Sequence, residues 1–168
     1  MAHDVPLRLR ILMALSDLLK TISVANGYKT DINGAVFRGR DMFGDGDPLP
    51  LLSILEIPVP FEFIEVPRGS AAAAGEWGLL IQGFVPDDPT NPTDPAHYLM
   101  ADVKRALATE KRRASGQNSN GIFDMGGRVE DIIISSGSVR PPDQLSAVAY
   151  FWIHVTLKIV EDNSDAYV

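Results

Sequence analysis

The chain of 168 residues contains no cysteine. This absence excludes disulfide bonds, thiolate nucleophiles and zinc sites built on cysteine. It fits a reducing compartment, where structural disulfides are rare.

Long apolar runs are missing as well. A membrane-spanning helix requires roughly 18 consecutive apolar residues, and no run in this sequence approaches that length. The apolar run at residues 11–15 is soon followed by Asp17, so it is too short for a signal peptide. We expect a soluble protein with no membrane partner.

Positive charge is in short supply. The chain has 15 Lys and Arg residues against 22 Asp and Glu residues, a net charge of −7. Proteins that bind a nucleic-acid backbone by counterion release are basic, so this balance argues against nucleic acid as a binding partner. It is compatible with a surface that DNA passes without adhering, because like charges repel. Acidity that serves solubility alone is the other interpretation.

The strongest structural signal is the stretch AVAYFWIHVTLKIV at residues 147–160. Its odd-numbered positions, from Ala149 to Ile159, are all apolar, whereas its even-numbered positions are mixed. This alternation predicts a long strand with one face on a core. At about 3.3 Å per residue it would span roughly 46 Å, more than the usual strand of about 5–6 residues. Its second face either carries subunit contacts or lies under helices that cover both sides of a central strand.

Two amphipathic helices are predicted. The first begins near Asp4 and Pro6, which favour a helix start, and ends before Gly27, which favours a C-cap. Its apolar stripe consists of Leu7, Ile11, Leu15, Leu18 and Ile22. The second has Asp94 as its cap and Pro95 at its first helical position. Its stripe consists of Leu99, Val103, Ala106 and Leu107.

The remaining sequence predicts strands joined by loops. Asn33-Gly34 predicts a β-hairpin between two short pieces. Further strands are expected at residues 51–57, 76–85 and 129–139, and an extended edge or loop at residues 58–67. We expect loose termini, with an acidic tail at residues 161–168, and mobile loops near residues 41–50, 67–75 and 114–128.

Strands that are grouped, rather than alternating with helices, indicate the α+β class. We predict one domain over residues 1–168, with a largely antiparallel (mixed) sheet covered by two main helices. Its length and its 45% hydrophobic content suit a single globular domain.

Two groups of acidic residues have the ligand types of a metal site. The first consists of Asp87, Asp88, Asp94 and His97, and the second of Asp41, Asp45 and Asp47. In the first, Asp94 is already explained as a helix cap. In the second, the twelfth position of a calcium loop would be Leu52 rather than a bidentate Glu. We predict no metal site and attribute these acids to capping and solvation.

Signals for catalysis are equally weak. The sequence has no G-x-S-x-G elbow, P-loop or G-x-G-x-x-G motif. His154 stands on a strand without an evident partner to orient it as a general base. We predict no catalytic or cofactor-binding residue, no cofactor and no enzymatic activity.

Subunit contacts are the better prediction. The even-numbered side of the strand at 147–160 carries aromatic side chains of the kind enriched at protein interfaces. Arg38 and Arg40 are placed to pair with acids of a neighbouring subunit, or else to deter strand pairing at a sheet edge. The candidate interface residues are Arg38, Arg40, Tyr150, Trp152, His154 and Lys158.

Four stretches together resemble a known family. They are GYKTDINGAVFRGRD after the first helix, EWGLLIQGFV, DPAHYLMADVKRALA, and the closing VEDIIISSGSVRPPDQLSAVAYFWIHVTLKIVED. In size and element order the chain resembles the tail terminator (tail completion, minor tail) proteins of long-tailed phages and prophages. That family has no catalytic signature to match, so no individual functional residue is carried over.

The resemblance implies a structural virion protein that is assembled in the host cytoplasm. It would form a hexameric ring on the head-proximal end of the tail tube, end tube polymerisation and offer a docking surface to head-completion (neck) proteins. Double-stranded DNA would pass through the lumen without specific binding. A head–tail connector or tail-tube-related protein is the first alternative, and a small ligand-binding or enzyme domain the second.

Overall fold

The fold is built on two long antiparallel strands, β3 (Ala72–Val85) and β6 (Ala149–Asp162). The computed structural model describes residues 4–58, 69, 71–114 and 129–167. Within them, β3 and β6 pair without interruption from Ala72 opposite Asp162 to Val85 opposite Ala149. The long final strand predicted from the alternating sequence is therefore confirmed, with both ends two residues further along the chain.

Shorter strands extend this pair on both sides. β2 (Leu51–Glu56) is antiparallel to β3, and β1 (Val36–Arg38) is parallel to β2 at the sheet edge. β4 (Val129–Ile134) and β5 (Ser138–Arg140) lie end to end along the other side of β6. The described sheet thus has the order β1-β2-β3-β6-β4, with β5 beside β6. The predicted α+β class with a mixed, mostly antiparallel sheet is confirmed.

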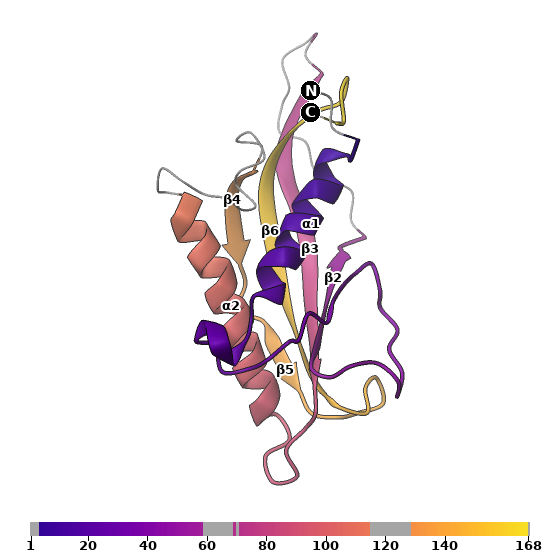
Figure 1. Ribbon diagram of the computed structural model, residues 1–168. Coiled ribbons are helices and arrows are strands. Elements are labelled where there is room, and N and C mark those ends of the chain that lie inside the picture. The colour runs from indigo at the N-terminus through magenta and orange to yellow at the C-terminus, as the bar shows by residue number, and fades with distance from the viewer. Residues whose placement is uncertain (1–3, 59–68, 70, 115–128, 168) are drawn as a thin grey trace.

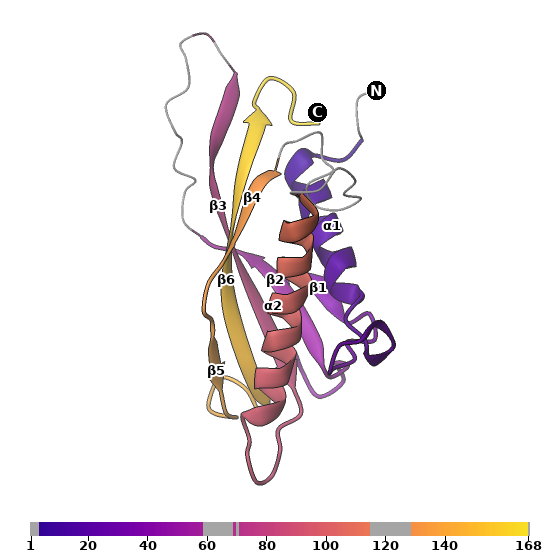
Figure 2. The ribbon, with the colours of Figure 1, turned by 90° about the vertical axis from the view of Figure 1, so that its left-hand side faces the viewer.

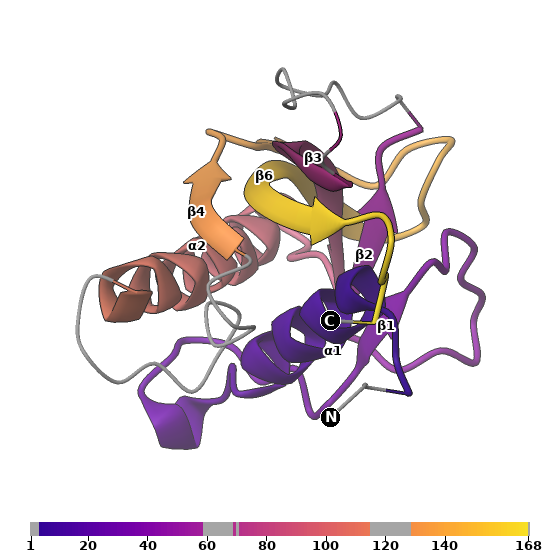
Figure 3. The same cartoon turned by 90° about the horizontal axis from the view of Figure 1, so that it is seen from above.

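Both helices, α1 (Leu7–Lys20) and α2 (Asp94–Ala114), lie on the same face of the sheet. Figure 1 looks onto this covered face, and Figure 2 shows the helices together on one side of the strands. Seen from above, α1 and α2 form a single layer (Figure 3). The interpretation in which helices cover both sides of the final strand is wrong for the described part of the chain.

Periodicity sets which residues make the core. Every odd-numbered residue of β6 from Ala149 to Ile159 is at most 1% exposed, as the alternation predicts. The helices supply the opposing layer with their apolar stripes. On α1 the buried residues include Leu7, Ile11, Leu15 and Leu19, and on α2 they include Ala96, Leu99, Val103, Ala106 and Leu107.

The N-terminal helix is shorter than predicted. It ends at Lys20 because the chain turns at Thr21 and then forms a short 3₁₀ helix, Val24–Asn26. Gly27 caps that second element in the left-handed conformation (φ 81°) instead of capping α1. At its start, α1 has Pro6 at the N-cap position, and no side chain caps it. In α2, Asp94 is the first helical residue rather than the cap, one position from the prediction.

The predicted hairpin at Asn33-Gly34 is wrong. Both residues have positive φ, at 51° and 76°, so the chain does turn there. However, residues 28–30 form no strand, and β1 pairs in parallel with β2. The turn therefore redirects the chain toward the sheet edge without joining two antiparallel strands.

Three other boundaries differ from the prediction. The strand expected at residues 129–139 is broken into β4 and β5, with Gly137 in the left-handed conformation between them (φ 75°). Residues 72–75, expected in a mobile loop, belong to β3, and Glu161 and Asp162, expected in a loose tail, belong to β6. Residues 41–50 lie outside helices and strands, as a loop should. The predictions for residues 1–3, 59–68, 70, 115–128 and 168 fall outside the described residues.

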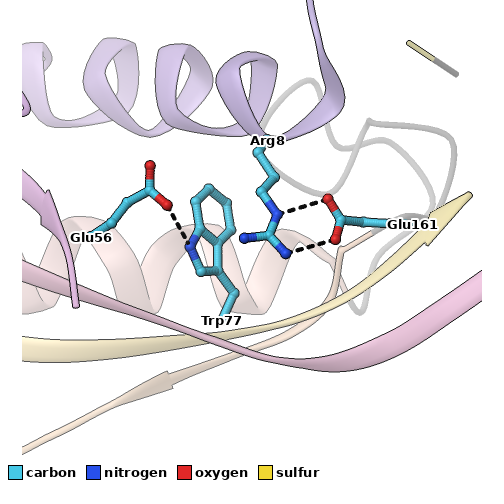
Figure 4. Close-up of polar contacts among 4 residues, drawn as sticks. All are labelled: Arg8, Glu56, Trp77 and Glu161. Atoms are coloured by element: carbon cyan, nitrogen blue, oxygen red, sulfur yellow. Dashed lines mark hydrogen bonds and ion pairs between the residues drawn. The ribbon is translucent and has the colours of Figure 1, made fainter. Parts of the chain in front are cut away.

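A cluster of polar contacts joins α1 to the sheet near the C-terminal end of β6. Figure 4 shows Arg8 of α1 donating from Nε and Nη2 to the two carboxylate oxygens of Glu161, both at 2.7 Å. The guanidinium carbon also lies 5.1 Å from the ring centroid of Trp77, whose Nε1 donates to Glu56 at 3.2 Å. The hydrogen bond to Glu161 raises the pKa of Arg8 above its usual range, although partial burial acts in the opposite direction. The cluster holds α1 on the covered face of the sheet.

Candidate subunit interface on the open face of the sheet

The face of the sheet turned away from α1 and α2 is the candidate site, and we call it the open face. Strand register assigns its residues, because successive side chains of a strand point to opposite sides. Since Ile153 and Ile81 are paired in the core, the even-numbered residues of β3 and β6 point to the open face. The open face includes Phe37, Leu51, Ser53, Leu55, Leu80, Gln82, Phe84, Ile133, Tyr150, Trp152, His154, Thr156 and Lys158.

Five aromatic rings form a row across one end of the open face. Ring centroids are 5.7 Å apart for Phe37 and Phe43, 5.3 Å for Phe43 and Phe84, 6.0 Å for Phe84 and Tyr150, and 5.7 Å for Tyr150 and Trp152. These separations fall in the favourable range for aromatic pairs, each of which contributes about 0.5–1.5 kcal/mol beyond area burial. The row links the edge strand β1 to the central strand β6 without help from a helix.

Two loops, at residues 41–50 and 141–148, reach over this aromatic end. Phe43 enters the row from the first loop, and the Ser53 hydroxyl donates to the Arg40 carbonyl. Leu51 and Ser53 are consequently fully buried although they point to the open face. The loops therefore cover part of the aromatic end, and we call the part of the open face beyond them its accessible part.

Arg40 belongs to the molecule's own packing. Its guanidinium carbon lies 5.0 Å from the Phe37 ring centroid and 4.8 Å from that of Phe43. Its Nη2 also forms an ion pair with Asp47 at 2.7 Å. The Gly44 N–H and then Arg40 lower the pKa of Asp47 below its usual range, against an opposing effect of desolvation. Arg40 thus stabilises the first loop, although its side chain is still exposed.

Tyr150 is also enclosed, with only 5% of its surface exposed. Its hydroxyl donates to Asp143 Oδ2 at 2.9 Å, and Arg140 lies 3.6 Å from the same carboxylate. Burial and then the Asp143 bond raise the pKa of Tyr150, while the Leu145 N–H and then Tyr150 lower that of Asp143. Tyr150 fastens the second loop to the sheet.

Trp152, His154 and Lys158 are the predicted interface residues that remain on the accessible part of the open face. His154 is exposed, and Trp152 and Lys158 are half-buried. Beside them lie Leu80, opposite His154, and Ile133, which is 42% exposed. We call these five residues the accessible strip. It combines an indole and two aliphatic side chains with an imidazole and an ammonium group, and the indole is the kind of side chain enriched at protein interfaces.

Arg38 lies elsewhere. It is paired with Ile54, a core residue, so its side chain leaves the edge strand on the side opposite Phe37. It is exposed at the sheet edge. The structure thus brings Trp152, His154 and Lys158 together, uses Arg40 and Tyr150 internally and sets Arg38 apart.

Three of the acids weighed as metal ligands have other roles in the structure. Asp88 Oδ1 accepts from the N–H groups of Thr90 and Asn91, and Asp94 lies in the first turn of α2. Asp47 is paired with Arg40. Across the described residues, no group of three or more His, Asp or Glu side chains is arranged to hold a metal ion. In the same residues, no helix is both long and apolar enough to cross a membrane.

Phe43, Phe84 and Asp143 were not among the residues predicted from the sequence. Phe84 was detectable, since it stands on the even-numbered side of the strand predicted at residues 76–85. Phe43 and Asp143 come from loops, where no periodicity predicts which side chain returns to the sheet.

No protein-family model matches the chain, and no curated protein matches it.

Proposed function

We propose that the protein is a structural subunit of a phage tail, a tail terminator that joins copies of itself into a ring. The ring would cap the head-proximal end of the tail tube, end its polymerisation and present a surface to the neck. The proposal starts from the resemblance of the sequence to that family and draws its physical support from the open face.

The single observation that carries the proposal is the one-sided sheet. A ladder as long as β3–β6 is covered by both helices on one face, while the other face exposes the accessible strip. Partly exposed indole and aliphatic side chains on a rigid strand lose little conformational entropy when they are buried by a partner. Such a strip is better suited to a protein partner than to a small substrate.

A closed ring requires a heterologous contact, in which two different surfaces of the same chain meet. The accessible strip supplies one surface, and Arg38 at the opposite sheet edge marks a candidate for the other. With a net charge of −7, the assembled protein would leave DNA free to pass, because like charges repel.

The test measures the mass of the purified protein, alone and mixed with tail tubes, by native mass spectrometry, and inspects the particles by electron microscopy. A six-membered ring, free or on tube ends, is the expected result. A monomer that neither assembles nor binds tube ends would overturn the proposal.

Phage particles made without the protein separate the terminator from a connector. Loss of a terminator yields tubes of uncontrolled length, whereas loss of a connector leaves tails of normal length unattached to heads. Normal unattached tails would move the protein to the connector class.

A further inference from the structure

A second surface lies at the aromatic end of the open face, between the loops at residues 41–50 and 141–148. The loops enclose a pocket of about 330 Å³, which we call the loop pocket. Phe43, Leu51, Phe84 and Val148 provide its apolar lining. This volume is at the lower end of the range for ligand sites, so the pocket suits one or two side chains better than a cofactor.

The lining of the loop pocket includes unusually exposed apolar side chains. Leu145 is 83% exposed and Met42 is 81% exposed, the two highest values among the large hydrophobic residues that the structure describes. Leu49, on the same pocket, is 39% exposed. Exposed apolar area is unfavourable in water relative to burial against a partner. Two such side chains beside one apolar pocket form a contact surface for an apolar group.

The lining is also acidic. Asp41, Asp45 and Asp47 contribute to it. Arg40 neutralises Asp47, but within residues 4–58, 71–114 and 129–167 neither Asp41 nor Asp45 has a hydrogen bond or ion pair. Two negative charges therefore remain beside the apolar lining. They disfavour a phosphate or carboxylate ligand and favour a cationic one.

We propose that the loop pocket binds a short segment of a partner protein in which one large apolar side chain is flanked by Lys or Arg. The apolar side chain enters the pocket and packs against Phe43 and Phe84, and Leu145 and Met42 cover it, while the basic flanks approach Asp41 and Asp45. This contact goes beyond ring formation, because the accessible strip does not line the pocket. The two surfaces can therefore be inactivated separately.

The probe is a fluorescein-labelled nonapeptide with a central Phe and Lys at the flanking positions, followed by fluorescence anisotropy. Two control peptides carry Ala in place of Phe or Glu in place of Lys. The wild-type protein is expected to bind the first peptide at least about tenfold more tightly than either control, and less tightly as salt is raised. Equal affinity for all three peptides, or no binding of the first, overturns the proposal.

Variants place the contact on the protein. Leu145→Ser is expected to weaken binding about tenfold or more, and the double variant Asp41→Asn/Asp45→Asn to remove most of the salt dependence. Val24→Ser is the matched control, because Val24 is 57% exposed but does not line the pocket. Binding that is unchanged in Leu145→Ser also overturns the proposal.

Native mass spectrometry distinguishes loss of peptide binding from loss of ring assembly. Leu145→Ser should assemble as the wild type does, and circular dichroism should confirm that it is folded. If Leu145→Ser no longer assembles but still binds the peptide, the pocket holds a second copy of this chain. The proposed partner segment is then wrong.

Discussion

Gly83 of β3 lies directly opposite Phe151 of β6, and the Phe151 ring occupies the space above the glycine. A Cβ atom at Gly83 would lie 2.9 Å from Phe151 Cδ1 and 2.6 Å from Cζ, distances that real Cβ atoms essentially never show. Phe151 is fully buried, so its ring has little freedom to move away. The missing side chain at Gly83 is thus what allows a phenylalanine at the centre of the covered face.

Gly83→Ala is accordingly expected to lower the free energy of unfolding by about 1–3 kcal/mol, the usual cost of overpacking a core. Urea denaturation followed by fluorescence measures the change. Gly46→Ala is the control, since a Cβ there meets nothing within 4 Å and the backbone needs no positive φ. If both variants match the wild type, the Gly83–Phe151 contact is not tight.

Ile153→Ala tests the assignment of the two faces of β6. Ile153 is fully buried, and its truncation leaves a cavity expected to cost about 2–5 kcal/mol of unfolding free energy. Thr156→Ala, on the open face of the same strand, is expected to cost far less. Thermal unfolding distinguishes the variants, and an unaltered melting temperature for Ile153→Ala would reverse the face assignment.

The parts of the fold that follow a period were predictable. The odd-numbered positions of β6 from Ala149 to Ile159 and the stripe of α2 are buried as their spacing predicts, because one side of each element packs on the core. Contacts between distant segments were not predictable in this way. Asn33-Gly34 has the local chemistry of a hairpin turn, but the parallel pairing of β1 with β2 depends on residues far along the chain.

In the candidate site, too, the predictable residues are those that follow the strand period. The alternation of β6 identified Trp152, His154 and Lys158 as one side of a strand, and the register confirms that they share it. It could not show that a loop would enclose Tyr150, or that Arg40 would lie over Phe37 and pair within its own loop. Those contacts depend on where the loops pack against the sheet, and the sequence of a loop has no periodicity that predicts this.

Arg8→Gln is expected to loosen α1. The variant removes the bidentate ion pair with Glu161. Because both side chains are only partly exposed, we expect a loss of about 1–2 kcal/mol in unfolding free energy. Combining it with Glu161→Gln in a double-mutant cycle isolates the pair. Lys20→Gln is the control, because Lys20 and Asp17 form an exposed pair on the same helix. Equal effects of Arg8→Gln and Lys20→Gln would show that the cluster in Figure 4 adds nothing.

Asp143 provides a pH test of the second loop. Its pKa is held below the usual carboxyl value of about 3.9 by the Leu145 N–H and the Tyr150 hydroxyl. The ionised carboxylate therefore stabilises the folded state above that usual value, and the contribution is lost as pH falls through the lower folded-state pKa. Asp143→Asn should lower the melting temperature at pH 6, with a difference that narrows below about pH 4. Asp45→Asn is the control, and a difference for Asp143→Asn that stays constant down to pH 2 would contradict the assignment.

Trp152→Ala tests the accessible strip as the assembly surface. Trp152 is half-buried on a strand whose core side is unaffected by the change, so the variant should stay folded. A buried tryptophan at an interface contributes about 2 kcal/mol or more, equivalent to roughly 30-fold in affinity, so native mass should shift from ring toward monomer. Arg38→Glu is expected to act in the same direction, because a heterologous contact uses two different surfaces of each subunit.

Tyr98→Ala is the matched control, since Tyr98 is a 59% exposed aromatic on α2, away from both surfaces. A ring that persists in Trp152→Ala and in Arg38→Glu would place the subunit contact elsewhere on the molecule, and loss of the ring in Tyr98→Ala would place it on the helical side.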